Sequence, residues 1–329
     1  MSRSPNQKLK VLYLLKILME KTDTEHTLTV QDMINELKKY NISAERKSVY
    51  DDIESLKSFG LDIVCRKSKT YDYYISDRSF QLPELKLLAD AVASSKFITE
   101  KKSKELIKKI GGLASNYEAK QLVRQIYVAG RVKTMNEKIY YNVDLIHQAI
   151  GIFKQISFKY FEYTLDKKKQ YRNNGNKYVA SPYALTWDDE NYYMISYYEK
   201  YKSITHFRVD KMEDIEIIEQ DCHREDLNIT EYTKKIFSMY GGEEETIRIQ
   251  FDNSLLGVVI DRFGKDTITY KVDGNSFIAI LTVELSPPLW GWIFQFGNKV
   301  KIVSPEKVKA EFLEYLDKVV GNYADIFFK

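Results

Sequence analysis

Apolar residues recur at helical spacing in two short segments between residues 29 and 60. The first segment is VQDMINELKK, which Thr29 can cap. The second runs from Ser43, at an N-cap position, to Gly60, which suits a helix end. A polar turn at residues 40–42 separates them. The apolar positions that follow the helical period are Val30, Met33, Ile34 and Leu37 in the first segment, and Val49, Ile53 and Leu56 in the second. The pattern predicts two helices joined by a tight turn.

The residues on either side extend this picture. An apolar helix is expected upstream around residues 9–19, and residues 61–66 and 71–75 are expected to form two strands across a basic turn. Residues 1–80 therefore predict a winged helix-turn-helix domain, with an ordinary surface helix pair as the alternative. In that domain the second helix of the pair enters the major groove, and the hairpin lies near phosphates. The expected DNA-contacting residues are Arg46, Lys47, Ser48, Tyr50, Arg66, Lys67 and Lys69.

Residues 81–140 are expected to form a helical connector. Pro83 opens one amphipathic helix, and residues 99–113 and 116–128 have the same period. Short amphipathic helices bury their apolar face on a neighbour or on a second copy of the chain. We expect this connector to carry dimer contacts, and a simple spacer is the alternative.

From residue 155 the period changes to two. Strands are expected at 156–160, 177–182, 184–187, 191–198 and 204–209, with a polar, lysine-rich loop at 164–175. Five short strands with polar turns favour a small SH3-like or Sm-like β-barrel, and we assign it residues 141–222.

The last part of the chain, residues 240–329, mixes strands and helices. After a short helical stretch at 232–239, strands are expected at 245–251, 266–272, 277–283 and 300–302. Helices are expected at 254–263, 288–296 and 305–320, the last capped by Ser304. This order predicts an α+β sandwich, so the fold class of the whole chain is multidomain α+β.

Composition adds little to this picture. The 329 residues are 44% hydrophobic and 29% charged, as in an ordinary globular protein. Residues 1–150 carry 26 basic against 19 acidic side chains, and residues 151–329 carry 24 against 28. The basic excess in the N-terminal half agrees with a DNA partner. No signal peptide or long apolar run is recognised, so we expect a cytoplasmic protein without membrane contact.

Neither metal nor catalytic chemistry is indicated. The two cysteines, Cys65 and Cys222, lack metal-ligand spacing, and the four histidines are scattered. Phosphate-binding, nucleophile-elbow and zinc-protease motifs are absent from the sequence. We expect no enzyme activity, no metal and no cofactor. A catalytic site assembled from distant residues is the alternative.

Three segments resemble a known family. The order S-x-x-R-K-S-V-Y-D-D-I-x-x-L-K-x-x-G-x-x-I, from Ser43 to Ile63, is similar to the N-terminal domain of the WYL-domain bacterial transcriptional regulators. That family typically has Arg-Asp where this chain has Asp51-Asp52. The segment SPYALTWDDENYYMISYYEKYKSITHFRVDKMEDIEII resembles the WYL domain itself. It keeps only the central Tyr193 of the namesake tripeptide, but its framework agrees at Pro182, Phe207-Arg208 and Asp210. The C-terminal part resembles the extension that follows many WYL domains.

The resemblance implies an effector site on the barrel. WYL domains use a surface rich in Tyr and Arg to bind an anionic effector, often a nucleic acid or a nucleotide. Strand alternation places His206 and Arg208 on the face opposite Phe207 and Val209. The expected effector-binding residues are Tyr193, His206, Arg208, Lys211, Tyr160 and Tyr183. A surface arginine paired with Asp210 or Glu213 is the alternative for Arg208.

The sequence therefore predicts a DNA-binding transcriptional regulator whose WYL domain senses an anionic effector. We expect a homodimer, because one recognition helix reads few base pairs and a two-fold pair doubles the site. The alternative is a nucleic-acid-processing or accessory protein that acts on single strands, with the helix-turn-helix as a docking module.

Overall fold

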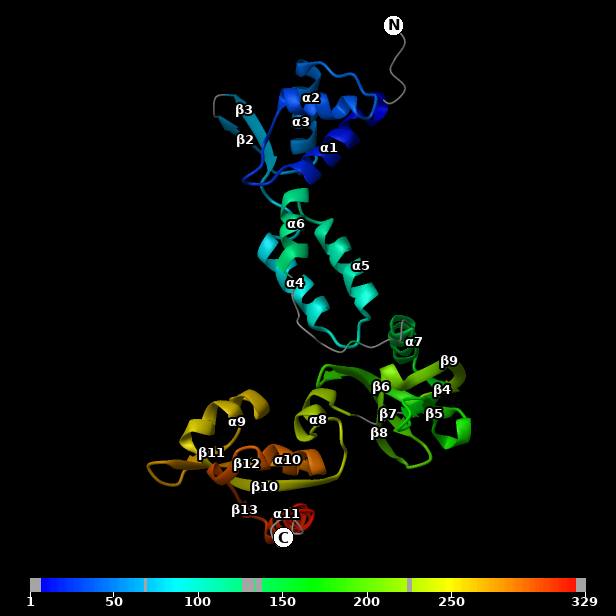
Figure 1. The fold of residues 1–329 in the computed structure, drawn as a ribbon, viewed down its shortest axis with the longest axis vertical. Helices are drawn as coiled ribbons and strands as arrows, with labels where there is room; N and C mark the ends of the chain where they lie inside the picture. The colour runs from blue at the N-terminus through cyan, green and yellow to red at the C-terminus, as the bar shows by residue number, and fades with distance from the viewer. Residues whose placement is uncertain (1–6, 68–69, 126–132, 134–137, 224–226, 324–329) are drawn as a thin grey trace. The chain divides into compact units, whose positions relative to one another are not determined.

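The computed structural model describes residues 7–67, 70–125, 133, 138–223 and 227–323, and these form a mixed α+β protein (Figure 1). The chain divides into two compact units, residues 1–137 and 138–329. The described residues contain eleven α-helices and three separate sheets. The predicted α+β class is confirmed at this level.

The first unit opens with three helices and a hairpin. Strands β2 and β3 pair antiparallel, and the two-residue strand β1 joins the outer side of β3. Apolar side chains from all three helices and from the hairpin form one buried core. The elements are α1 (Lys10–Lys21), β1 (Leu28–Thr29), α2 (Val30–Lys38), α3 (Arg46–Ser58), β2 (Ile63–Lys67) and β3 (Tyr71–Ile75).

Helix ends in this unit follow local capping chemistry. Thr29 caps α2 in a capping box with Asp32, as the sequence predicts. The predicted cap at Ser43 is wrong, because α3 begins at Arg46 and the N-cap residue is Glu45, whose side chain makes no cap bond. At the other end Gly60 has φ +109°, and the amide of Leu61 donates to the carbonyl of Leu56 at 3.1 Å. This left-handed glycine closes α3 as predicted.

Three further helices complete the first unit. Two small apolar clusters hold them together, one centred on Leu85 and Leu122 and the other on Ala89 and Ile107. The buried hydroxyl of Ser115 donates to Asp23 at 2.5 Å, which ties this bundle to the end of α1. The helices are α4 (Leu82–Ser94), α5 (Glu100–Gly111) and α6 (Asn116–Gln125).

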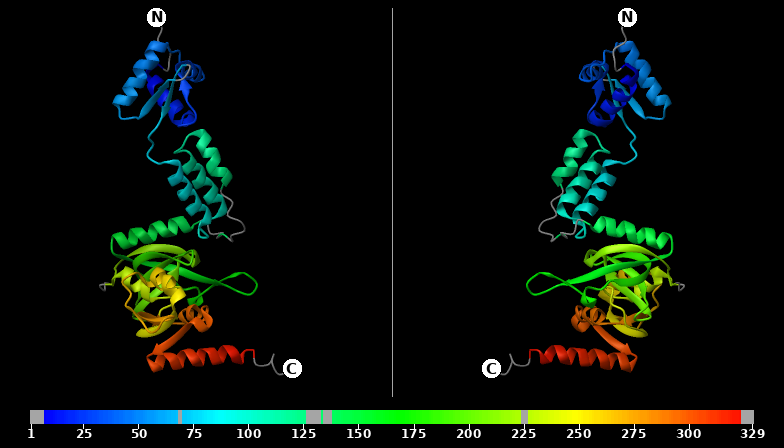
Figure 2. Two further views of the ribbon diagram at one scale, coloured as in Figure 1. Left: turned by 90° about the vertical axis from the view of Figure 1, so that its left-hand side faces the viewer. Right: turned by 90° about the vertical axis from the view of Figure 1, so that its right-hand side faces the viewer.

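The second unit begins with α7 (Ile139–Gly151), which packs on a curled, six-stranded antiparallel sheet (Figure 2). The strand order is β5-β4-β6-β7-β8, and β9 pairs with the other side of β4. In Figure 2 the β4–β5 hairpin extends away from the sheet. The strands are β4 (Lys154–Tyr163), β5 (Lys169–Tyr171), β6 (Tyr178–Asp188), β7 (Asn191–Tyr198), β8 (Ser203–Arg208) and β9 (Met212–Asp221).

This sheet corrects three predictions. The expected loop at 164–175 contains strand β5, and β9 was not expected at all. The two strands expected at 177–182 and 184–187 are one strand, β6, with a register shift between Pro182 and Ala184. Proline cannot donate to a ladder, so a bulge beside it interrupts the period without ending the strand.

The remainder of the second unit is a four-stranded antiparallel sheet of order β11-β12-β10-β13 with helices packed on it. Its apolar core includes Phe251, Trp290 and Val308. The predicted cap at Ser304 is wrong, since Ser304 ends β13, paired with Arg248, and Pro305 is the N-cap residue of α11. The elements are α8 (Ile229–Lys235), β10 (Glu243–Asp252), α9 (Leu256–Phe263), β11 (Thr269–Lys271), β12 (Ser276–Leu285), α10 (Pro287–Phe294), β13 (Val300–Ser304) and α11 (Glu306–Gly321).

Candidate functional site

Strand β8 presents the predicted effector residues on one face. Phe207 and Val209 are 5% and 0% exposed, so they belong to the core. His206 and Arg208 point to the opposite face, where both are half-buried. The predicted alternation is confirmed, and it makes this face of β8 the natural place to look for a site.

Arg208 is held by a fixed set of partners. Its Nε and one Nη2 proton donate to the carboxylate of Asp210 at 3.0 and 2.8 Å, and Nη2 also donates to Asn191 at 2.8 Å. The predicted alternative, a pairing with Asp210, is therefore present. Burial lowers the pKa of Arg208, but the hydrogen bond and charge of Asp210 outweigh it and the pKa is raised. Among the described residues none bonds Nη1, so that end of the guanidinium stays available to a ligand.

Two tyrosines flank Arg208. Tyr193 lies directly opposite it on β7 and is half-buried, and its pKa is raised mainly by burial. Tyr160 is 8% exposed, and its hydroxyl accepts the backbone amide of Arg208 at 3.2 Å. Burial raises the pKa of Tyr160 to about 12. Tyr160 thus supports the backbone of β8 from the core, and Tyr193 is the tyrosine with an accessible face.

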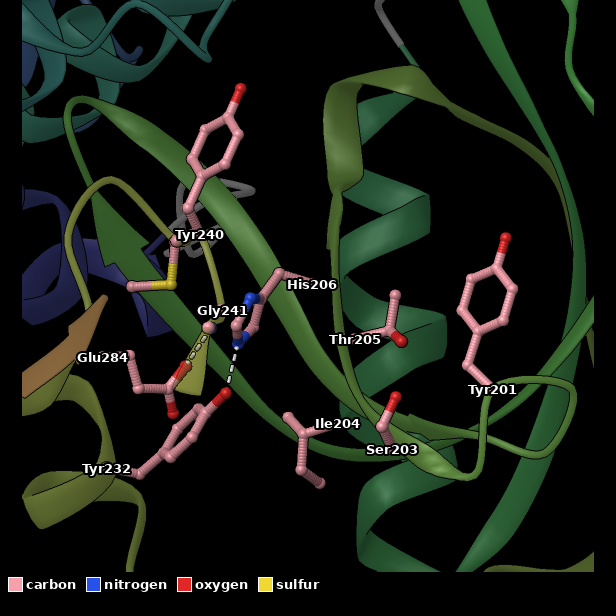
Figure 3. A pocket seen from close by; sticks show the side chains of 11 residues that line it. Tyr201, Ser203, Ile204, Thr205, His206, Tyr232, Tyr240, Gly241 and Glu284 are labelled. Atoms are coloured by element: carbon pink, nitrogen blue, oxygen red, sulfur yellow. Dashed lines mark hydrogen bonds between the residues drawn. The ribbon is translucent and has the colours of Figure 1, made fainter. Parts of the chain in front are cut away.

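His206 faces a cavity of about 560 Å³ (Figure 3). Its Nε2 lies 3.0 Å from the hydroxyl of Tyr232 on α8, and burial lowers its pKa. Residues of the stretch 201–206 form one wall, and residues 239–242 form another with Glu284 of β12. Tyr232 and Glu284 were not expected at this site from the sequence. The adjacent Gly241-Gly242 was the one local signal in the sequence for a close approach of backbone.

Gly242 and Glu284 are locked together in this cavity wall. The amide of Gly242 donates to Oε2 of Glu284 at 2.8 Å, and a Cβ on Gly242 would lie 1.9 Å from the carbonyl oxygen of Leu285. Glu284 is 8% exposed, and burial raises its pKa. Only glycine fits at position 242, because it alone lets the backbone pass this close to Leu285. The close approach places the Gly242 amide within reach of the Glu284 carboxylate.

The two remaining predicted effector residues are Tyr183 and Lys211. Tyr183 is beside the bulge of β6, where its hydroxyl is 3.0 Å from Nδ1 of His223. It lines a smaller hollow of about 220 Å³ that shares no lining residue with the cavity at His206. Lys211 is half-buried in the short turn after β8. The structure therefore places Tyr193 and His206 on the same face as Arg208, and Tyr160 in the core behind that strand, and it separates Tyr183 from them.

On the first unit, the start of α3 is open to solvent. Arg46 and Lys47 are exposed, and Tyr50, one turn later, is 39% exposed. Ser48 differs, because it is half-buried and accepts a hydrogen bond from Lys10 of α1. Lys10 also pairs with Asp52 at 2.8 Å. Lys10 thus fixes α3 against α1 and leaves Arg46, Lys47 and Tyr50 as the accessible side chains.

The hairpin adds two more exposed cations, Arg66 and Lys67, at the end of β2. Lys69, the third predicted hairpin residue, lies outside the described residues. The exposed basic side chains of the helix and the hairpin are of the kind that contact phosphates and base edges in protein–DNA complexes.

Neither a metal-binding cluster nor a disulfide occurs within the described residues. They contain no cluster of three or more His, Cys, Asp or Glu side chains that could hold a metal ion. Cys65 and Cys222 are not joined in a disulfide bond. None of the helices, over the same part of the chain, combines the length and apolar character needed to cross a bilayer.

Comparison with protein families assigns two domains. Residues 141–217 match the WYL domain, and residues 243–320 match the WCX domain. The first match covers α7 and most of the curled sheet, including Tyr193, His206 and Arg208, and the second covers the C-terminal sheet with its helices. The second unit is therefore a WYL domain followed by a WCX domain. No curated protein sequence matches the chain.

Solved structures give weaker likenesses. Proteasome accessory factor B/C (PafBC) of Arthrobacter aurescens is 17% identical over 98% of this chain, with a TM-score of 0.28. This chain spans half the length of the PafBC chain. A CRISPR Cas-related protein is 11% identical over 99% of this chain and 94% of its own length, with a TM-score of 0.37.

Proposed function

We propose that the chain is a WYL-type transcriptional regulator that binds operator DNA through residues 1–80 and an anionic effector through its WYL domain. The observation that carries this proposal is the WYL domain match over residues 141–217, which includes Tyr193 and Arg208 on adjacent strands. The exposed basic start of α3 supports the DNA-binding part.

The proposed DNA-binding module is a winged helix-turn-helix. Helices α2 and α3, the turn between them and the β2–β3 hairpin follow one another in the order that this module requires. Lys10 holds α3 by its bonds to Ser48 and Asp52, on the side away from Arg46 and Lys47. We infer that Arg46 and Lys47 contact DNA in the major groove, that Tyr50 lies beside them, and that Arg66, Lys67 and Lys69 contact phosphates.

The proposed effector carries a negative charge and a planar group. Nη1 of Arg208 can donate to a phosphate oxygen while Asp210 keeps the guanidinium oriented, and the Tyr193 ring beside it offers a surface for stacking. A single-stranded oligonucleotide or a nucleotide has both features. Because Asp210 neutralises part of the charge of Arg208, we expect an affinity that depends on both contacts together.

The test is selection of bound fragments from a random duplex library by the full chain, followed by titration of the selected duplex at increasing salt. A winged helix-turn-helix regulator enriches one sequence, with an affinity that falls as salt rises. Addition of short single strands or nucleotides to that complex then tests the effector. Enrichment of no sequence, together with cleavage or remodelling of labelled single strands, would support the processing role instead.

A further inference from the structure

The cavity beside His206 has the wrong charge for an anion. Among the described residues that line it there is no lysine or arginine, and its one carboxylate is Glu284. We propose that this cavity binds a small organic cation, bearing an amine, amidine or guanidinium group, through the carboxylate of Glu284 and the surrounding tyrosine rings. This inference does not depend on DNA binding or on the effector proposed at Arg208.

Only one of the two carboxylate oxygens of Glu284 has a hydrogen-bond partner among the described residues. Oε2 accepts the amide of Gly242 at 2.8 Å, which fixes the orientation of the group. Oε1 has no hydrogen-bond partner within the described part of the chain. The nearby Lys235 already pairs with Glu244 at 2.9 Å. A buried carboxylate with one open oxygen and no paired cation is stabilised by a ligand that brings the missing positive charge.

The rest of the lining suits the same ligand. Tyr201 and Tyr240, 64% and 58% exposed, line the cavity with Tyr232, and Figure 3 shows Tyr232 close to both His206 and Glu284. Cations are attracted to the faces of such rings. His206 donates no competing charge, since its burial favours the neutral imidazole. The hydroxyls of Ser203 and Thr205 add further polar contacts.

Size and charge exclude the other obvious occupants. A volume of about 560 Å³ lies in the range of small-molecule sites and is too small for a folded partner. A phosphate or carboxylate would meet Glu284 at close range, and like charges in a partly desolvated site repel strongly. The anionic group proposed for Arg208 therefore does not enter this cavity.

The experiment is calorimetry and NMR titration of the full chain with three organic cations, benzamidine, agmatine and spermidine. Benzamide and benzoate serve as neutral and anionic analogues of benzamidine. We expect at least one cation to bind and benzoate not to bind. In Glu284→Gln the amide oxygen can still accept from Gly242, so the fold is kept while the charge is lost. The affinity should fall about tenfold or more, the loss expected for one charge-assisted hydrogen bond.

Two further variants make the result decisive. Glu243→Gln is the matched control, because Glu243 is exposed at the start of β10 and pairs with Lys307, so its affinity should equal that of the wild type. Ser203→Lys adds a cation to the cavity rim at an exposed position and should weaken binding without touching Glu284. Thermal unfolding checks that each variant is folded. If none of the three cations binds, or if Glu284→Gln binds them as the wild type does, the proposal is wrong.

Discussion

At the scale of single residues, one backbone contact in the second unit leaves no room for a larger side chain. Gly242 and Gly241 are neighbours in sequence, yet only Gly242 has backbone within clashing distance of an added Cβ. At Gly241 the nearest atom is the end of the Glu284 side chain, at 3.3 Å. Glycine is therefore required at position 242 for steric reasons, and no such requirement applies at position 241.

We predict that Gly242→Ala destabilises the protein and that Gly241→Ala does not. The added methyl group at 242 must push the Leu285 backbone away, at a cost of about 1–3 kcal/mol, as for other overpacked sites. Glu284 can shift by rotating its side chain, so Gly241→Ala should lower the free energy of unfolding by less than about 0.5 kcal/mol. Urea unfolding of the two variants measures the difference. Equal midpoints would mean that β10 and β12 can separate at this point at no cost.

For Arg208 the prediction concerns ligand response. Arg208→Ala should abolish the effect of a single-stranded or nucleotide effector on DNA binding, since it removes the proposed phosphate contact. Ligand-free DNA affinity should stay unchanged. The side chains of Arg208 and Asp210 are 33% and 22% exposed, so loss of the pair should cost only about 1 kcal/mol of stability. Lys200→Ala, at an exposed position in the turn between β7 and β8, is the control. An unchanged response in Arg208→Ala, measured on the selected operator, would place the effector elsewhere.

At the scale of elements, strand β8 and helix α3, which carry proposed contact residues, are each anchored by buried side chains on one face. β8 is anchored by buried Phe207 and by Val209, which is buried directly after the strand ends, and α3 by buried Val49 and Ile53 and by the bonds of Lys10. The opposite face of each is free to carry polar side chains without loss of core packing. Substitutions on those open faces should therefore change binding far more than stability.

Substitutions on the helix and on the hairpin of the first unit should therefore have different effects on DNA binding. Arg46→Ala should weaken binding to the selected duplex by roughly 1–3 kcal/mol and flatten discrimination at one base pair. Lys67→Ala should weaken all duplexes about equally and reduce the salt dependence. Lys57→Ala is the control, because Lys57 pairs with Glu54 at the far end of α3. Fluorescence anisotropy with specific and scrambled duplexes separates the cases. If both variants bind like the control, residues 1–80 do not contact DNA as proposed.

At the scale of the whole molecule, the described helices of the first unit leave apolar side chains uncovered. Leu87 and Leu88 on α4 are 72% and 42% exposed, and Leu113 after α5 is 45% exposed. Exposed leucines that are neighbours on one helix are typical of contact surfaces. They support the homodimer expected from the needs of operator reading.

We predict a dimer of about twice the 38.7 kDa chain mass in light scattering at micromolar concentration. Leu87→Glu combined with Leu88→Glu should shift the protein to monomer, because burying two carboxylates at an interface is unfavourable. Leu165→Glu is the matched control, since Leu165 is fully exposed at the tip of the β4–β5 hairpin. A wild-type protein that is monomeric both free and on DNA would leave residues 81–140 as a spacer.

The sequence determined what depends on local periodicity and capping. The helical period predicted α2 and α3, Thr29 and Gly60 marked two of their ends, and alternation placed Phe207 and Val209 in the core with His206 and Arg208 opposite. These signals are readable because each concerns residues within one or two turns, or within one strand.

Tertiary structure decided what depends on residues far apart in the chain. The period of two failed at β7, where Met194 and Ile195 are both fully buried because neighbouring elements cover both faces of this central strand. Tyr183 left the predicted site because a bulge at Pro182 displaced it, and Ser48 turned out to bond Lys10. The cavity at His206 could not be predicted from the sequence for the same reason. Glu284 and Tyr232 reach it from separate elements, and only the packing of β8, α8 and β12 brings their side chains together.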